Sequence, residues 1–148
     1  MDFTAKLHHE LRNTKLRIKK KYEWDDDLLN MTINEYSKFL ILHKKYPGKV
    51  VPGKMIDKIW HDHILHTQKY ISFCEVEFGK YIHHVPNDLS NDKILNRKLT
   101  YELYENIFGY KPSDIFWGSN KYKHLNDIKN KDEDVNCEAA SCGDCVGT

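Results

Sequence analysis

Residues 51–79 read VPGKMIDKIWHDHILHTQKYISFCEVEFG, and this stretch decides the fold. Proline suits the first turn of a helix and glycine the position just past its end, so Pro52 and Gly79 predict one helix over about residues 54–78. At about 100° per residue, its apolar side chains form a single stripe, with His63 in the middle. The stripe consists of Ile56, Ile59, Trp60, Ile64, Ile71, Cys74 and Phe78, and the opposite side carries Lys58, Asp62, Lys69 and Val76.

The segments on either side of this helix also have helical periodicity. A first helix is predicted over about residues 3–21, and a second begins near Asp27 or Thr32 and ends before Pro47. The last helix opens near Asn91, a good N-cap residue, and runs to Gly109. Sustained period-two alternation, the signal for strands, is absent. The sequence therefore predicts an all-α fold, a small single-domain bundle of about four helices.

The chain changes character near its C-terminal end. We expect residues 1–123 to form the helical domain, and residues 124–148 to form a polar linker and a flexible tail that contains cysteines, because few apolar side chains remain there to order it.

Charge and hydropathy exclude several classes of function. With 23 basic and 22 acidic residues among 148, no global field attracts nucleic acid, so we expect no nucleic-acid partner. No apolar run approaches the roughly 18 residues of a membrane span, and none resembles a signal peptide. We therefore expect no membrane association, a cytoplasmic location and reduced cysteines.

A cluster of histidines is the strongest chemical signal, because imidazole is the commonest protein ligand for metals. His61 lies about 160° from His63 around the helix, so the two cannot easily bind one ion while both remain helical. The turn at Gly79 can bring His83 or His84 back along the helix. We expect a site made of His63, one of these two residues and a residue from another helix, for a zinc, iron or copper ion. The whole candidate pool is His61, His63, His66, His83 and His84.

Two neighbouring residues are expected to support the cluster. Asp57 lies four residues before His61, the spacing at which a carboxylate orients an imidazole, although an exposed surface pair has the same spacing. Thr67, one turn after His63, is the expected hydrogen-bond partner of that ring. His63 itself is equally consistent with a hydrogen-bonded core residue, and His66 with a half-exposed boundary residue.

The cysteines form a separate candidate site. Cys137, Cys142 and Cys145 lie close together in the tail, and the last two form a Cys-x-x-Cys motif, which is typical of soft-metal binding or thiol exchange. Cys74 lies on the apolar stripe and is expected to be an inert buried thiol.

Several of these motifs resemble a known family. The run VPGKMIDKIWHDHIL of residues 51–65, the HHVP of residues 83–86 and the cysteine- and glycine-containing tail are similar to the glycine-rich domain-containing-protein-like family. The resemblance implies an architecture and a motif, but no established reaction.

Three functions follow as expectations, in this order: a metal-binding domain with an accessory thiol tail, a non-catalytic interaction or scaffold domain for an unknown protein partner, and a thiol redox protein. We favour a non-enzymatic role, because the chain has no Gly-x-Ser-x-Gly, phosphate-binding glycine loop or His-Glu-x-x-His motif. Cys74 with His63 or His84 would be a nucleophile and base, but a thiol on a buried stripe lacks activation.

Overall fold

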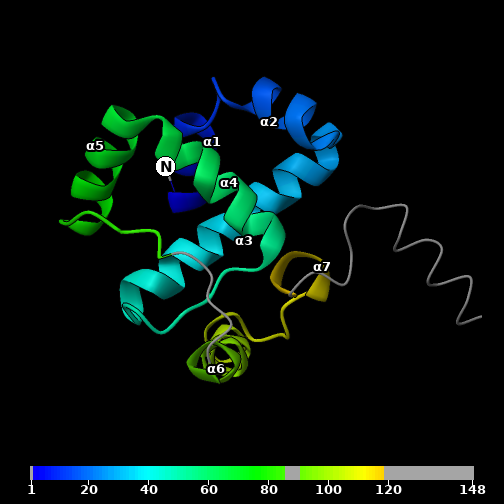
Figure 1. Ribbon diagram of the computed structural model, residues 1–148, viewed down its shortest axis with the longest axis vertical. Helices are drawn as coiled ribbons and strands as arrows, with labels where there is room; N and C mark the ends of the chain where they lie inside the picture. Colours follow the sequence, from blue (N-terminus) through cyan, green and yellow to red (C-terminus); the bar gives the residue numbers. More distant parts are fainter. Residues whose placement is uncertain (1, 86–90, 119–148) are drawn as a thin grey trace, which may run out of the picture.

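The computed structural model describes residues 2–85 and 91–118, and every regular element in these residues is an α-helix (Figure 1). This confirms the all-α prediction. The number of helices in these residues is larger than the expected four or so, because two of the predicted helices are each divided by a break and because Asp114–Trp117 forms a further short helix. The elements are α1 (Phe3–Glu10), α2 (Lys15–Tyr22), α3 (Asp26–Lys45), α4 (Lys54–Leu65), α5 (Thr67–Phe78), α6 (Asn91–Phe108) and α7 (Asp114–Trp117).

The helix predicted over about residues 54–78 is broken at His66, which separates α4 from α5. Its ψ of 69° is outside the helical range, and its N–H donates to the carbonyl of His63, three residues back, as in a tight final turn. The carbonyl of His66 then accepts from the N–H of Tyr70, and this hydrogen bond closes the first turn of α5. The break rotates the apolar face of α5, so Tyr70 is buried while Ile71, assigned to the stripe, is 43% exposed.

The first predicted helix is divided in the same way. Residues 11–14 form a turn between α1 and α2, in which the Thr14 hydroxyl donates to the carbonyl of Leu11. Leu7, Leu11 and Ile18 are all buried. The turn therefore lets two short helices follow the surface of the core, where one straight helix would leave it.

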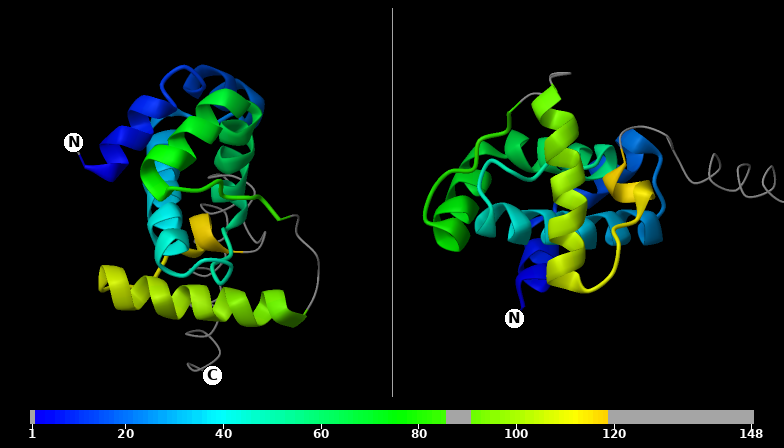
Figure 2. Two further views of the ribbon diagram at one scale, coloured as in Figure 1. Left: turned by 90° about the vertical axis from the view of Figure 1, so that its left-hand side faces the viewer. Right: turned by 90° about the horizontal axis from the view of Figure 1, so that it is seen from below.

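Helix α3 is the centre of the bundle. Its first turn is capped by Asp25, whose carboxylate accepts from the N–H of Leu28 at 2.8 Å. Helices α1, α2 and α4 all pack against it. Figure 2 shows α6 lying across α3 on another side, so α3 is enclosed by helices of different directions. Its fully buried side chains include Ile33, Tyr36, Phe39, Leu40 and Leu42.

The short helix α7 holds the N-terminal end of α4 in place. Trp117 is fully buried and its indole N–H donates to Glu35 of α3 at 2.7 Å. The backbone of Phe116 lies so close to Gly53 that a Cβ atom on this glycine would be 1.8 Å from the Phe116 carbonyl oxygen. Only glycine fits there, and the contact fixes where α4 begins.

The burial of Asp62 also differs from the helical-wheel prediction. We expected it on the solvent side of its helix, but its side chain is fully buried. Arg17 of α2 donates to its Oδ1 atom at 2.9 Å, and the ammonium of Lys21 lies 3.9 Å from Oδ2. The helical-wheel prediction assumed that α4 is covered on one side only. In the structure α3 covers one flank of α4, and side chains of α2 cover another.

None of the helices in the described part of the chain combines the length and the apolar composition that crossing a bilayer requires.

Candidate metal centre

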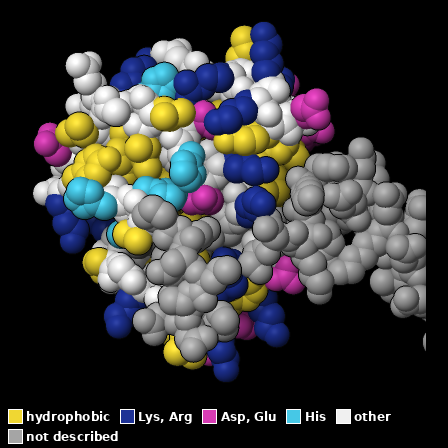
Figure 3. Space-filling model, in the orientation of Figure 1, with side chains coloured by type: hydrophobic (Ala, Val, Ile, Leu, Met, Phe, Trp, Pro, Cys, Tyr) yellow, Lys and Arg dark blue, Asp and Glu magenta, His cyan; other side chains and the backbone are white. Residues whose placement is uncertain are grey.

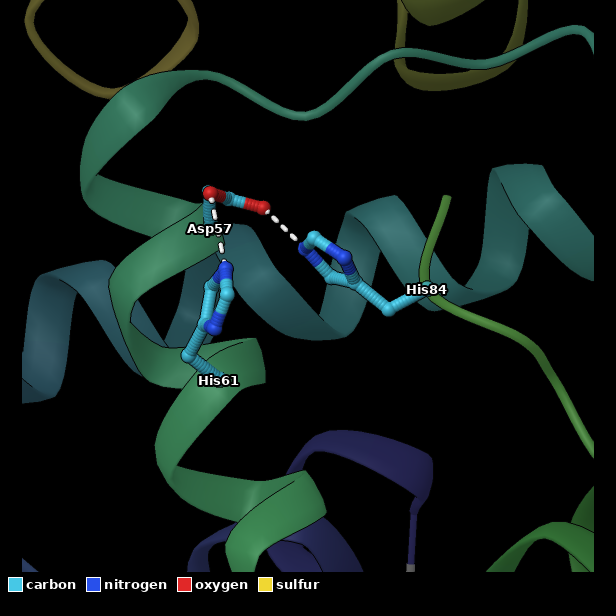
Figure 4. A group of neighbouring side chains, drawn as sticks. All are labelled: Asp57, His61 and His84. Atoms are coloured by element: carbon cyan, nitrogen blue, oxygen red, sulfur yellow. Dashed lines mark hydrogen bonds and ion pairs between the residues drawn. The ribbon is translucent and has the colours of Figure 1, made fainter. Parts of the chain in front are cut away.

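One carboxylate and two imidazoles meet at the surface of α4. Asp57 accepts a 2.6 Å hydrogen bond from, or shares a proton with, Nε2 of His84, and its other oxygen lies 3.4 Å from Nε2 of His61 (Figure 4). The ligand-type atoms of these three residues all lie within 4.8 Å of one another. Asp57 and His61 are one turn apart on α4, so the helix itself places them side by side.

His84 reaches this group through the segment that follows α5. That segment begins at Gly79, whose φ of 71° is the left-handed conformation expected at a helix end. The Tyr70 hydroxyl accepts from the indole N–H of Trp60 at 2.9 Å and donates to the carbonyl of Ile82 at 2.6 Å. Ile82 is buried. A buried hydrogen-bond chain therefore fixes the returning segment against α4, two residues before His84.

The group is open on one side and closed on the other. The His61 side chain is 56% exposed, whereas those of Asp57 and His84 are 20% and 15% exposed. The His84 ring packs on Trp60 with a centroid distance of 4.5 Å, and the two imidazole rings are 4.3 Å apart. Figure 3 shows that histidine side chains gather on this face of the molecule, beside exposed hydrophobic side chains. A small ligand can therefore approach from the side of His61.

Two imidazole nitrogens and one carboxylate oxygen are suitable donors for a transition-metal ion. Such an ion sits about 2.0–2.2 Å from each donor, so small side-chain movements from the present spacing would bring all three into contact. The hydrogen bond between Asp57 and His84 would then give way to two bonds to the ion. Three protein ligands leave further coordination positions for water or another molecule, as in open metal sites.

His63, the centre of the sequence prediction, lies elsewhere. Its ring is 2% exposed, and its Nδ1 atom shares a 2.9 Å hydrogen bond with the hydroxyl of Tyr36. Burial, with a smaller effect from nearby His66, lowers the pKa of His63 to about 3. The inward orientation agrees with the stripe, but the structure does not bring His63 into the group of Asp57, His61 and His84. Its partner is also Tyr36 rather than the expected Thr67, which is exposed.

The remaining predicted residues are dispersed. His66 is half-buried at the break between α4 and α5, and His83 is exposed, with its ring 4.6 Å from that of Tyr81. Cys74 is buried, and burial raises the pKa of its thiol, as expected for an inert cysteine. The predicted tail site falls outside the described residues, and so do the domain boundary at residues 123 and 124 and the expected flexibility beyond it. The tail cysteines concerned are Cys137, Cys142 and Cys145.

Asp57 was predicted only to orient His61. In the structure one of its oxygens faces His61 and the other faces His84. The return of the chain after Gly79 was the available signal for His84. Tyr70, which anchors that return, gave no comparable signal, because a tyrosine at a core position is ordinary.

The chain belongs to the UCP032817-like family, whose model matches residues 3–101. The match spans α1 to α5 and part of α6, and so includes Asp57, His61 and His84. The assignment to the glycine-rich domain-containing-protein-like family was therefore wrong, and the name of the matching family states no activity. Comparison with curated proteins and with solved structures gave no match.

Proposed function

We propose that this protein binds one transition-metal ion through Asp57, His61 and His84. The observation that carries the proposal is the meeting of three ligand-type atoms within 4.8 Å, from two separate segments of the chain. The donor set of two imidazoles and one carboxylate suits zinc or ferrous iron, and leaves coordination positions open.

The surroundings of the group support this function. Trp60 lies behind His84 and shields it from water, and Tyr70 holds the segment that carries His84. Metal ligands need such supporting contacts, because a ligand that moves freely loses entropy when it binds. The group thus has two ligands on a helix, one on an anchored segment, and an open side at His61.

The proposal can be tested by isothermal titration with Zn²⁺ of protein purified without a polyhistidine tag. The tail thiols are a competing site, so the titrated chain should carry Cys137→Ser, Cys142→Ser and Cys145→Ser. We expect His84→Ala and Asp57→Asn each to weaken Zn²⁺ binding at least about tenfold, which corresponds to about 1.4 kcal/mol.

The matched control is His83→Ala, which removes the adjacent, exposed imidazole. It should leave the affinity unchanged within about twofold. Equal losses in the His83 and His84 variants, or no loss in either, would contradict the proposed site. Repeating the titration anaerobically with Fe²⁺ then decides which ion the site prefers.

A further inference from the structure

A second pair of ligand-type atoms lies buried on the opposite flank of α4. Nε2 of His63 is 3.7 Å from Oε1 of Glu10, which is in the last turn of α1. Neither atom is exposed, and neither has a hydrogen-bond partner in the part of the chain that the structure describes. Buried polar atoms are almost always paired, so two such atoms facing each other indicate a bound group between them.

The His63 ring is held in a fixed orientation. The hydroxyl of Tyr36 bonds to its Nδ1 atom, and the rings of Tyr70 and Phe73 pack edge-on against it with centroid distances of 4.9 and 5.0 Å. When Nδ1–H donates to Tyr36, the lone pair of Nε2 points toward Glu10. A hydrogen bond on the far nitrogen is also how proteins orient the histidines that bind metals.

The distance between the two atoms suits an ion better than a direct bond. At 3.7 Å the two atoms are too far apart for a hydrogen bond. Two ligands at about 2.1 Å from one ion are up to about 4.2 Å apart, so a single ion fits between them. We propose that Glu10 and His63 bind a divalent transition-metal ion at a second site, separate from the one formed by Asp57, His61 and His84.

An ion can reach this site from the surface. Glu10 and Phe73 line a groove of about 520 Å³ between α1 and α5. The side chain of Glu10 is 25% exposed, so it connects the groove to the buried ring of His63. The ammonium of Lys6 is paired with Glu77 at 3.4 Å, which offsets its repulsion of a cation. Arg12 and Lys69 also line the groove, so an ion must enter past positive charge.

The ligand-type atoms of His66 do not lie within 4.8 Å of those of both Glu10 and His63, so His66 would become a third ligand only if its side chain moved. It lies one turn after His63, at the break between α4 and α5, and its Nε2 atom is also buried without a hydrogen-bond partner among the described residues. Because its backbone is outside the helix, its side chain direction is not tied to the helical wheel.

The test removes the first site and asks whether the second remains. The starting protein carries Asp57→Asn and His84→Ala, together with serine at the tail cysteines, and is titrated with Co²⁺ while the visible absorption of the bound ion is followed. We expect one equivalent of Co²⁺ to bind. Adding Glu10→Gln, which keeps the size of the side chain, should weaken this binding at least about tenfold.

Glu75→Gln is the matched control, because it makes the same exchange at an exposed position of α5 that does not line the groove. It should leave Co²⁺ binding unchanged. Absence of Co²⁺ binding in the starting protein would overturn the second site and point to a buried water between Glu10 and His63. Equal binding with and without Glu10→Gln would overturn it as well.

Two further measurements protect the test from misfolding and from confusion with the first site. Should Glu10→Gln fail to fold, ¹⁵N NMR of the histidine rings with diamagnetic Zn²⁺ replaces it, and an unshifted Nε2 signal of His63 overturns the proposal. In the protein with Asp57 and His84 intact, two equivalents support both sites. One equivalent that survives Asp57→Asn and His84→Ala supports only the second site, and one that is lost supports only the first.

Discussion

The two flanks of α4 place neighbouring histidines in opposite environments. On one flank His61 is mostly exposed, and its neighbours Asp57 and His84 already contact each other. On the other flank His63 is almost fully buried, and its Nε2 atom and Glu10 face each other without bonding. The two histidines are two residues apart in the sequence. Spacing on a helix therefore decides which flank a histidine occupies, and the elements packed on that flank decide its chemistry.

The buried side chains of α4 should be more sensitive to mutation than the exposed ones, and the largest effect is expected at Arg17 of α2, the partner of the buried Asp62. Arg17→Ala leaves the fully buried carboxylate of Asp62 with only the distant Lys21. The Arg17 side chain is 46% exposed, but the carboxylate that it leaves behind is fully buried, so loss of Arg17 should cost about 3 kcal/mol because the remaining charge is not solvated. Urea unfolding should show this loss.

Lys20→Ala, at an exposed position of the same helix, is the control and should change the free energy of unfolding by less than about 0.5 kcal/mol. Combining Arg17→Ala with Asp62→Asn should recover part of the loss. A loss at Arg17 no larger than at Lys20 would show that α2 does not cover Asp62 in solution.

The next effect compares the two histidines directly. His63→Ala should destabilise the protein by about 2 kcal/mol, because it removes packing and leaves the buried Tyr36 hydroxyl without its partner. His61→Ala, at an exposed position, should cost less than about 0.5 kcal/mol. Both variants are measured by urea unfolding in the presence of a chelator, and equal costs would contradict the difference between the flanks.

A third prediction concerns the support of the open flank. Tyr70→Phe removes the hydroxyl that joins Trp60 to the carbonyl of Ile82, and leaves two buried groups unpaired. We expect a loss of about 1.5 kcal/mol in unfolding free energy, and weaker Zn²⁺ binding, because His84 is then less well held. Unchanged Zn²⁺ affinity in this variant would show that His84 does not need the anchor.

The smallest effect appears only at high pH. It involves two tyrosines, Tyr36, which bonds to His63, and Tyr70, which anchors the segment that carries His84. Burial raises the pKa of both Tyr36 and Tyr70 above the ordinary value of 10.0. The folded state then keeps protons that the unfolded state loses, so stability is complete below pH 10 and falls as the pH rises above it. Each tyrosine should cost about 1 kcal/mol between pH 10 and 11.

This pH dependence is measured by urea unfolding across that range. Tyr36→Phe and Tyr70→Phe should each make it shallower. A slope that neither variant changes would assign the effect to other groups.

Some of the fold could be predicted from the sequence, because glycine and capping residues act locally. Gly79 ends α5 and Gly109 follows the end of α6, both with positive φ. The break at His66 could not be predicted, since neither glycine nor proline marks it. The burial of Asp62 was missed for another reason, because it depends on α2, which is distant in the sequence.

The candidate site was predictable to a similar extent. The histidine cluster and the return of the chain after Gly79 were visible, and they led to the right region. The grouping of its members was not, because it depends on which flank the returning segment follows. Tyr70 and Ile82 fix that path, and Glu10 reaches His63 only because α1 packs against α3. Such contacts are tertiary and have no local pattern.

The break at His66 also sets the reach of the chain. Had α4 and α5 formed one straight helix, Phe78 would lie about 26 Å along the axis from His61, at about 1.5 Å per residue. The residues from Phe78 to His84 span at most about 21 Å when fully extended, so the backbone of His84 would stop about 5 Å short of His61 along the axis. The non-helical ψ at His66 thus turns α5 away from the axis of α4. This change of direction lets the segment after α5 bring His84 back to Asp57 and His61.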